Sequence, residues 1–311
     1  MCGYSIIHPR PKMDKAVIQT EGLTKYYGKK LGISEVNIRI RAGEVFGYLG
    51  PNGAGKTTTI RILMDFIRAD RGQALIFGLD STQSAPAIHR RVGYLPGDLT
   101  LYENMTVKEM FEFFTRLRNG VDQIWIEKLA DRFQCDLSHP IRTLSQGNKQ
   151  KVGIIQAFMH RPELLILDEP TRGLDPLVRG EFYNLVRESR KEGCTVFLSS
   201  HVLPEVERVC DRVGIIRSGR IVAVEDVDEL KKRSVRQVEV EFVRPVARDA
   251  LASIDGLEII NMTENRAICR ITGTMDPLIK RLGRYEILDI SSQNPGLEEI
   301  FLTYYGEGKK G

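Results

Sequence analysis

The chain lacks the long apolar run that a membrane-spanning helix requires. Such a helix needs about 20 consecutive apolar residues, and no stretch of this sequence approaches that length. The first residues also lack the basic start and apolar core of a secretory signal. We therefore expect a cytoplasmic protein, and if it works at a membrane, another subunit must supply the membrane-spanning part.

Paired cysteines and a strong net charge are also missing. The five cysteines form no C-x-x-C pair and lie at no zinc spacing from histidines, which suits free thiols in a reducing compartment. The net charge is only +4, from 45 basic and 41 acidic residues spread along the chain. A general nucleic-acid groove is therefore not expected. The cysteines are Cys2, Cys135, Cys194, Cys210 and Cys269.

The length of 311 residues accommodates one large domain and a smaller one, each with its own core. Residues 1–12 are predicted to form a loose tail. Residues 13–232 are predicted to form the main domain, with a helical subdomain at about 97–160. The pattern changes after Arg233, so residues 233–311 are predicted to form a second domain.

A glycine-rich loop is the strongest positive signal. Residues 50–58 read GPNGAGKTT, which fits G-x-x-x-x-G-K-[ST]. The apolar run Val45–Leu49 precedes it and a helical pattern follows, as this phosphate-binding motif requires. Glycines let backbone N–H groups close around phosphate oxygens, and the helix dipole favours negative charge there. We expect Lys56 to reach the β- and γ-phosphates and the Thr57 hydroxyl to bind Mg²⁺. The other nucleotide contacts predicted in the loop are Asn52, Gly53, Ala54, Gly55 and Thr58.

Two carboxylates follow a continuous apolar run. Leu164–Leu167 is typical of a central parallel strand covered on both faces. Asp168 is then expected to hold Mg²⁺ through water, and Glu169 to polarise the attacking water as general base. Alone, such a strand end is common and needs no catalytic role.

Three further segments carry weaker signals. Ser145 is predicted to cap a helix whose free N–H groups could bind an anion, although an ordinary capped helix looks the same. Gly173–Pro176 is a turn sequence. His201 follows a predicted strand, where ligands bind in parallel sheets, although a lone histidine is more often a surface residue.

The order and spacing of these motifs together resemble the ATP-binding cassette (ABC) family, over roughly Val17 to Lys232. The resemblance implies that Leu144–Gln150 is the ABC signature and that Gly173–Asp175 lies in the D-loop. It also implies that His201 is the switch histidine and that Tyr27 stacks on adenine.

The same resemblance implies a homodimer. Each ATP would lie between the phosphate loop of one copy and Ser145 and Gly147 of the other. ATP binding would close the dimer and hydrolysis would reopen it, which would drive a separate transmembrane permease.

Two motifs depart from the family pattern. The signature usually reads LSGGQ, and here Gln146 and Asn148 replace the first Gly and the Gln. The family also places a metal-contacting Gln where this chain has Gly97. The next residue, Asp98, could supply an oxygen to the metal instead, or it could be a turn residue.

Periodicity predicts several local structures. Thr106 and Glu109 have the spacing of a capping box. Lys25–Gly28 is predicted to be an exposed aromatic loop. After Arg233 the predicted order is strand, helix, strand, strand, helix and strand, which resembles a split β-α-β unit of ferredoxin-like type. The helices are expected near Ala247–Ser253 and Pro277–Gly283, and a last one at Leu297–Tyr304.

We therefore predict an α/β fold: a P-loop cassette with a mixed sheet core, an antiparallel β subdomain and a helical subdomain, plus a small α+β ferredoxin-like domain. The ending Leu297–Leu302 resembles the accessory domain of drug-exporter ATPases. The prediction is an ATP- and Mg²⁺-dependent ATPase subunit of an exporter, on the cytoplasmic face of the membrane.

Two alternatives belong to other classes. A soluble ABC ATPase could act on ribosomes or DNA, but such members usually carry two cassettes or a long coiled coil, and neither pattern is present. A P-loop kinase or GTPase would need neither the signature nor His201. The cargo cannot be predicted, because its contacts lie mainly in the permease.

Overall fold

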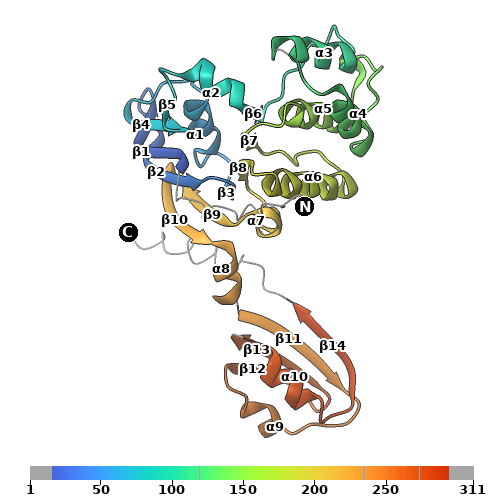
Figure 1. Cartoon of the computed structure of the whole chain (residues 1–311). Helices are drawn as coiled ribbons and strands as arrows, with labels where there is room; N and C mark the ends of the chain where they lie inside the picture. Colours follow the sequence, from blue (N-terminus) through green and yellow to red (C-terminus); the bar gives the residue numbers. More distant parts are fainter. Residues whose placement is uncertain (1–15, 119, 234, 273, 294–311) are drawn as a thin grey trace, which may run out of the picture. The chain divides into compact units, whose positions relative to one another are not determined.

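A computed structural model describes residues 16–293 except 119, 234 and 273. The chain divides into two compact units, the first ending at Val224 and the second beginning at Glu225 (Figure 1). The sequence pattern predicts this boundary after residue 232. Within the described ranges, no helix is both long enough and apolar enough to cross a membrane.

A six-stranded sheet forms the centre of the first unit. Its strands β9, β3, β8, β7 and β6 pair in parallel. Every residue of β3, β7 and β8 is buried, as expected for central strands. Because these strands are parallel, their carboxyl ends meet at one edge of the sheet. The spatial order is β10 (Arg220–Asp226), β9 (Arg212–Arg217), β3 (Val45–Leu49), β8 (Thr195–Ser200), β7 (Leu164–Asp168) and β6 (Val92–Leu95).

A second, antiparallel sheet belongs to the same unit. Its order is β2 (Lys30–Arg41), β1 (Ala16–Tyr27), β4 (Arg71–Ile76) and β5 (Leu79–Asp80). The predicted loop at Lys25–Gly28 is wrong, because Lys25–Tyr27 belong to β1 and Tyr27 pairs with Lys30. Only two residues are left for the turn, and Gly28 allows it by taking a positive φ of 61°.

Helices α3 to α5 gather at one end of the first unit (Figure 1). The predicted capping box of α3 is confirmed: the Thr106 hydroxyl accepts from the Glu109 amide at 3.2 Å, and the Glu109 carboxylate accepts from the Thr106 amide at 2.7 Å. The helices are α1 (Lys56–Leu63), α2 (Ala85–Arg91), α3 (Val107–Leu117), α4 (Gln123–Arg132), the short 3₁₀ turn η1 (Ile141–Thr143), α5 (Gln146–Phe158), α6 (Pro176–Lys191) and α7 (Leu203–Val209).

The second unit begins with α8 (Val227–Arg233) and contains a four-stranded antiparallel sheet in the order β12-β13-β11-β14. Strand β13 lies between β11 and β12, which is the predicted split β-α-β arrangement. Helix α9 is shorter than predicted, and the predicted helix Leu297–Tyr304 lies outside the described residues. The remaining elements are β11 (Val235–Phe242), α9 (Asp249–Ala252), β12 (Leu257–Met262), β13 (Arg266–Thr272), α10 (Asp276–Leu282) and β14 (Ile287–Gln293).

Candidate functional site

The glycine-rich loop lies between β3 and α1, as its sequence predicts. Gly55 caps α1 with a φ of 111°, a conformation that strongly favours glycine. A Cβ at Gly55 would lie 2.6 Å from a side-chain carbon of Ile33, and one at Gly50 would lie 2.4 Å from the Ile216 carbonyl oxygen. The close packing beneath the loop therefore explains two of its glycines.

Lys56 begins α1 and is buried, and its ammonium group lies beneath this loop. Its Nζ donates to the carbonyl oxygens of Gly50 at 2.7 Å and Pro51 at 3.2 Å. Nζ also lies 3.1 Å from Oε1 of Glu169. The loop therefore holds a cation in a fixed position next to a carboxylate.

Asp168, the last residue of β7, is fully buried. One of its carboxylate oxygens accepts a hydrogen bond from the Thr57 hydroxyl at 2.7 Å, and the other accepts from the Ser199 hydroxyl. Thr57 and Asp168 thus present hard oxygen atoms side by side, the ligand type that Mg²⁺ takes. The described residues contain no cluster of three or more His, Cys, Asp or Glu that could hold a metal alone. These two residues therefore fit an Mg²⁺ ion whose remaining ligands are phosphate and water.

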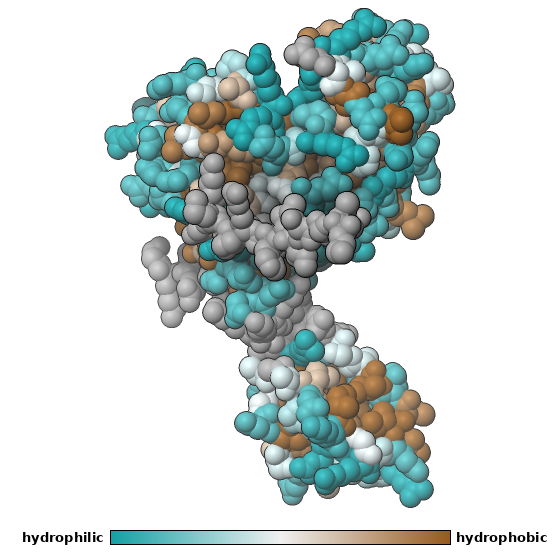
Figure 2. All heavy atoms as spheres, viewed as in Figure 1, coloured by the Kyte–Doolittle hydropathy of each residue, from teal (hydrophilic) through white to brown (hydrophobic). Residues whose placement is uncertain are grey.

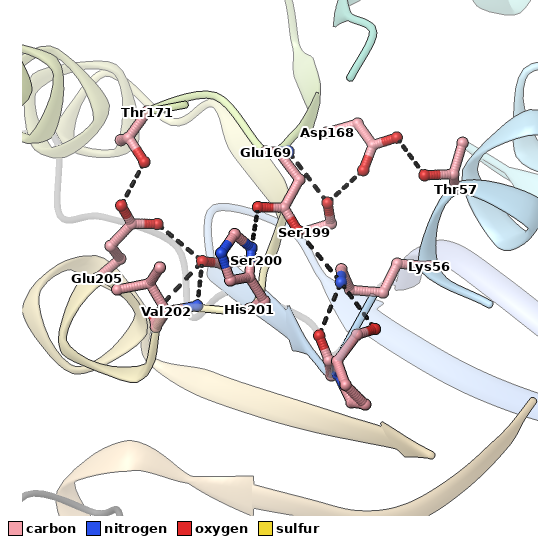
Figure 3. A network of polar contacts seen from close by, with 12 residues as sticks. Lys56, Thr57, Asp168, Glu169, Thr171, Ser199, Ser200, His201, Val202 and Glu205 are labelled. Carbon is pink, nitrogen blue, oxygen red and sulfur yellow. Dashed lines mark hydrogen bonds and ion pairs between the residues drawn. The ribbon is translucent and has the colours of Figure 1, made fainter. Parts of the chain in front are cut away.

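Glu169 follows β7 and lies between a cation and an imidazole (Figure 3). Its Oε2 is 2.6 Å from Nδ1 of His201, while its Oε1 faces Lys56. The backbone of Glu169 has a positive φ of 51°, which is uncommon for a residue other than glycine. Its amide donates to the carbonyl and hydroxyl oxygens of Ser199 at 3.2 and 3.1 Å, so β8 holds this conformation in place.

A cavity of about 470 Å³ opens over these groups, within the usual range for a small-molecule site. The predicted residues that line it are Tyr27, Asn52, Gly53, Gly55, Lys56, Thr57, Thr58, Asp98, Asp168 and Glu169. Ala54, Ser145, Gly147 and His201 do not line it. Sequence reasoning missed Lys30, Leu31, Gly32 and Arg172, which also line it. The signal for Arg172 was its place between Glu169 and the Gly173 turn, whereas nothing local indicated the three residues of β2.

Tyr27 stands at the rim of the cavity. Its phenol oxygen lies 3.4 Å from the Thr58 hydroxyl, and the residue is 46% exposed. Tyr26 is equally exposed but does not line the cavity, and its amide donates to Asp70 at 2.6 Å. Of the two tyrosines, Tyr27 is therefore the one that lines the cavity.

The predicted signature segment, Leu144–Gln150, does not line this cavity. Ser145 caps α5, and its hydroxyl accepts from the Asn148 amide at 3.3 Å. A Cβ at Gly147 would lie 2.8 Å from the Gly173 carbonyl oxygen, so this glycine permits close contact with the turn at Gly173. Gln146 and Asn148, the two departures from LSGGQ, are exposed on the first turn of the helix. They leave the cap and the glycine unchanged.

Comparison with known proteins gives consistent matches. The ABC transporter family profile matches residues 33–172. The bacitracin transport ATP-binding protein BcrA of Bacillus licheniformis is 38% identical over 307 residues, covering 95% of this chain and 99% of that protein. The solved structure of an ATP-binding subunit of an ABC transporter is 30% identical with a TM-score of 0.64, covering 70% of this chain and 92% of that one. A dimeric cassette in a post-hydrolysis state with ADP and Pi has the same fold, at 20% identity and a TM-score of 0.62, over 68% of this chain and 98% of that one.

Proposed function

The chain belongs to the ATP-binding subunits of ABC transporters, and we propose that it powers an exporter whose membrane-spanning part is a separate permease. ATP binding and hydrolysis are the activities of this family. The name of the bacitracin transport relative supports an antimicrobial compound as the class of cargo. This proposal gives the protein a place on the cytoplasmic face of the membrane, held there by the permease.

The arrangement around Glu169 carries the proposed mechanism. Its carboxylate lies between Lys56 and His201, at the strand edge where Thr57 and Asp168 face the cavity. We assign Glu169 as the general base that accepts a proton from water. We assign Lys56 to the β- and γ-phosphates and His201 to holding the Glu169 carboxylate. Bound Mg²⁺, held by Thr57 and by Asp168, would neutralise charge on the phosphates.

The position of the signature supports a dimer. Ser145 and Gly147 do not line the cavity of their own chain, yet Ser145 begins a helix whose first N–H groups favour an anion. We propose that a second copy of this chain presents these residues to the ATP bound here. Two copies would then complete two sites, and hydrolysis would open both.

The core of the second unit supports a separate accessory domain. The buried residues from Val238 to Leu282 form one apolar cluster of their own around β11, β13 and α10. We propose that the second unit is an accessory domain with a separate core, which leaves the nucleotide chemistry to the first unit.

Replacing Glu169 with glutamine tests the proposed function. Glu169→Gln should bind ATP but hydrolyse it about 10²- to 10⁴-fold more slowly, because the amide cannot accept a proton from water. The variant should elute as an ATP-bound dimer in size-exclusion chromatography, while the wild type returns to monomer after hydrolysis. Wild-type turnover by the variant would remove Glu169 from the role of base. Co-purification with ribosomes or DNA rather than a membrane protein would overturn the exporter assignment.

A further inference from the structure

Glu205 on α7 is a buried carboxylate outside the cavity. It is 4% exposed and does not line the ATP site. No ion pair joins it to a cation in the part of the chain that the structure describes. Burying a carboxylate without a cation is unfavourable unless hydrogen bonds compensate. The Glu205 carboxylate must therefore be stabilised by hydrogen bonds rather than by a cation.

Two hydroxyl groups compensate the Glu205 charge (Figure 3). One carboxylate oxygen accepts from the Thr171 hydroxyl, and the other accepts from the Ser200 hydroxyl at 2.7 Å. The Ser200 oxygen in turn accepts from the Val202 amide at 2.9 Å. Tyr183 faces the same carboxylate from α6, and burial together with the Glu205 charge raises the pKa of its phenol. Glu205 thus joins segments from three parts of the chain.

The two hydroxyl partners flank the reacting pair. Thr171 lies two residues after Glu169, and Ser200 directly precedes His201. The peptide between Glu169 and Thr171 is also fixed, because the Pro170 carbonyl accepts from the Gln150 amide at 2.9 Å. The contact between Glu169 and His201 therefore spans the two segments that Glu205 ties together.

We propose that Glu205 is a positioning residue that holds Glu169 and His201 in register for ATP hydrolysis. The inference rests on the proposed roles of those two residues. A carboxylate accepts hydrogen bonds and donates none, so it directs both hydroxyl protons toward itself. That leaves the Ser200 lone pairs free to accept from the Val202 amide, which fixes the turn that carries His201. Glutamine has one acceptor oxygen, so it cannot satisfy both hydroxyls in the same way.

The first experiment compares Glu205→Gln with Glu44→Gln. Glu44 is also buried and accepts from the Arg41 amide at 2.7 Å, but it precedes β3 and so lies at the opposite end of that strand from the phosphate loop. For each variant we would measure the ATP dissociation constant by calorimetry and kcat at saturating ATP, at a temperature where circular dichroism shows full folding. Glu205→Gln should lower kcat by about tenfold or more, as expected when a hydrogen bond to a charged group is lost. Its ATP affinity, and the kcat of Glu44→Gln, should remain at the wild-type value.

The second experiment separates positioning from a general effect on folding. Thr171→Val and Ser200→Ala should each lower kcat, and they carry the test if Glu205→Gln does not fold. Adding Glu205→Gln to the Thr171→Val/Ser200→Ala background should lower kcat no further, because the two hydroxyls through which Glu205 holds the segments of Glu169 and His201 are already gone, whereas Tyr183 lies on neither segment. Additive losses, or wild-type kcat in Glu205→Gln, would overturn the inference and leave the proposed function standing. A wild-type protein that does not hydrolyse ATP would instead overturn the proposed function and this inference with it.

Discussion

In the first unit, buried polar side chains gather where β3, β7 and β8 end, whereas the second unit buries only apolar side chains and Cys269 among its described residues. Four of these side chains are less than 9% exposed: Lys56, Asp168, Ser199 and Glu205. Hydrogen bonds join the segments that carry them, because Thr57 and Ser199 donate to Asp168 and Ser200 donates to Glu205. In the second unit, ion pairs such as Arg270–Glu258 lie on the surface. Figure 2 also shows apolar side chains gathered on the surface of the second unit over β14, where Leu288 and Ile290 are exposed.

This difference indicates where each unit's stability and chemistry lie. Burying polar groups costs free energy unless every group has a partner. The first unit accepts that cost at several places, and one of them is the edge of the sheet where Lys56 and Asp168 line the cavity. The described residues of the second unit bury no charged side chain, so its core is formed by apolar packing. The predictions below test this separation.

The largest expected effects come from replacing a buried phenylalanine with alanine in the core of each unit. Phe242 lies in the core of the second unit, where its ring centroid is 6.0 Å from that of Tyr285. In the first unit, Phe197 stacks on Phe46 with the ring centroids 6.1 Å apart. Truncating a buried Phe to Ala typically costs about 3–5 kcal/mol. We expect Phe242→Ala to leave ATP binding unchanged, and Phe197→Ala to weaken it because β8 carries the site.

Thermal unfolding and calorimetric ATP titration would measure both effects. Loss of ATP binding in Phe242→Ala would mean that the two units share one cooperative core, and the comparison would fail. Unchanged binding in Phe197→Ala would show that the strand-edge site tolerates disruption of its own sheet.

The next effect concerns the buried cation of the first unit. Lys56→Ala should weaken ATP binding by about 1.5–3 kcal/mol, the value of a hydrogen bond to a charged group. Lys29→Ala is the matched control, because Lys29 is exposed and does not line the cavity. Equal affinities for the two variants in calorimetry would refute the assignment of the phosphate loop.

The sequence predicted those features that depend on local spacing. The phosphate loop, the β7 strand and the caps of α3 and α5 each follow from residues within one segment, and each is present. The predicted fold class is confirmed, and so is membership of the ABC ATPases.

Features that depend on pairing between distant segments were not predictable in the same way. Lys25–Tyr27 contain two tyrosines, which suit either an exposed loop or a strand, and only pairing with β2 decides between them. Lys30–Gly32 reach the cavity because of that pairing. The Glu205 contacts depend on the close approach of β7, β8 and α7, which no spacing along the chain reveals.

A smaller effect is expected at the rim of the cavity. Tyr27→Ala should weaken ATP binding by about 1–3 kcal/mol, the range for stacking of a base on an aromatic ring. Tyr26→Ala is the matched control, since Tyr26 has the same exposure but does not line the cavity. A larger loss in Tyr26→Ala would place the stacking residue one position earlier.

The smallest expected effect concerns Asp98. Gly97 passes close to Asp168, since a Cβ at Gly97 would lie 3.1 Å from one of its carboxylate oxygens. Asp98 lines the same cavity and is exposed. Burial and the charges of Asp168 and Asp98 raise the pKa of Tyr94 to about 12, so the negative charges of both carboxylates are felt at the same phenol. A divalent cation would offset this concentration of negative charge.

If Asp98 supplies an oxygen to Mg²⁺, Asp98→Ala should raise the Mg²⁺ concentration for half-maximal ATPase activity by less than about tenfold, the lower end of the effect of losing an outer metal contact. Binding of ATP without metal should change little, because one repulsive charge goes and no phosphate contact is lost. Asp98→Asn keeps one oxygen and should fall between the alanine variant and the wild type. Superimposable Mg²⁺ titrations for all three proteins would show that Asp98 is a turn residue before Leu99, and that water occupies the position where the family has its glutamine.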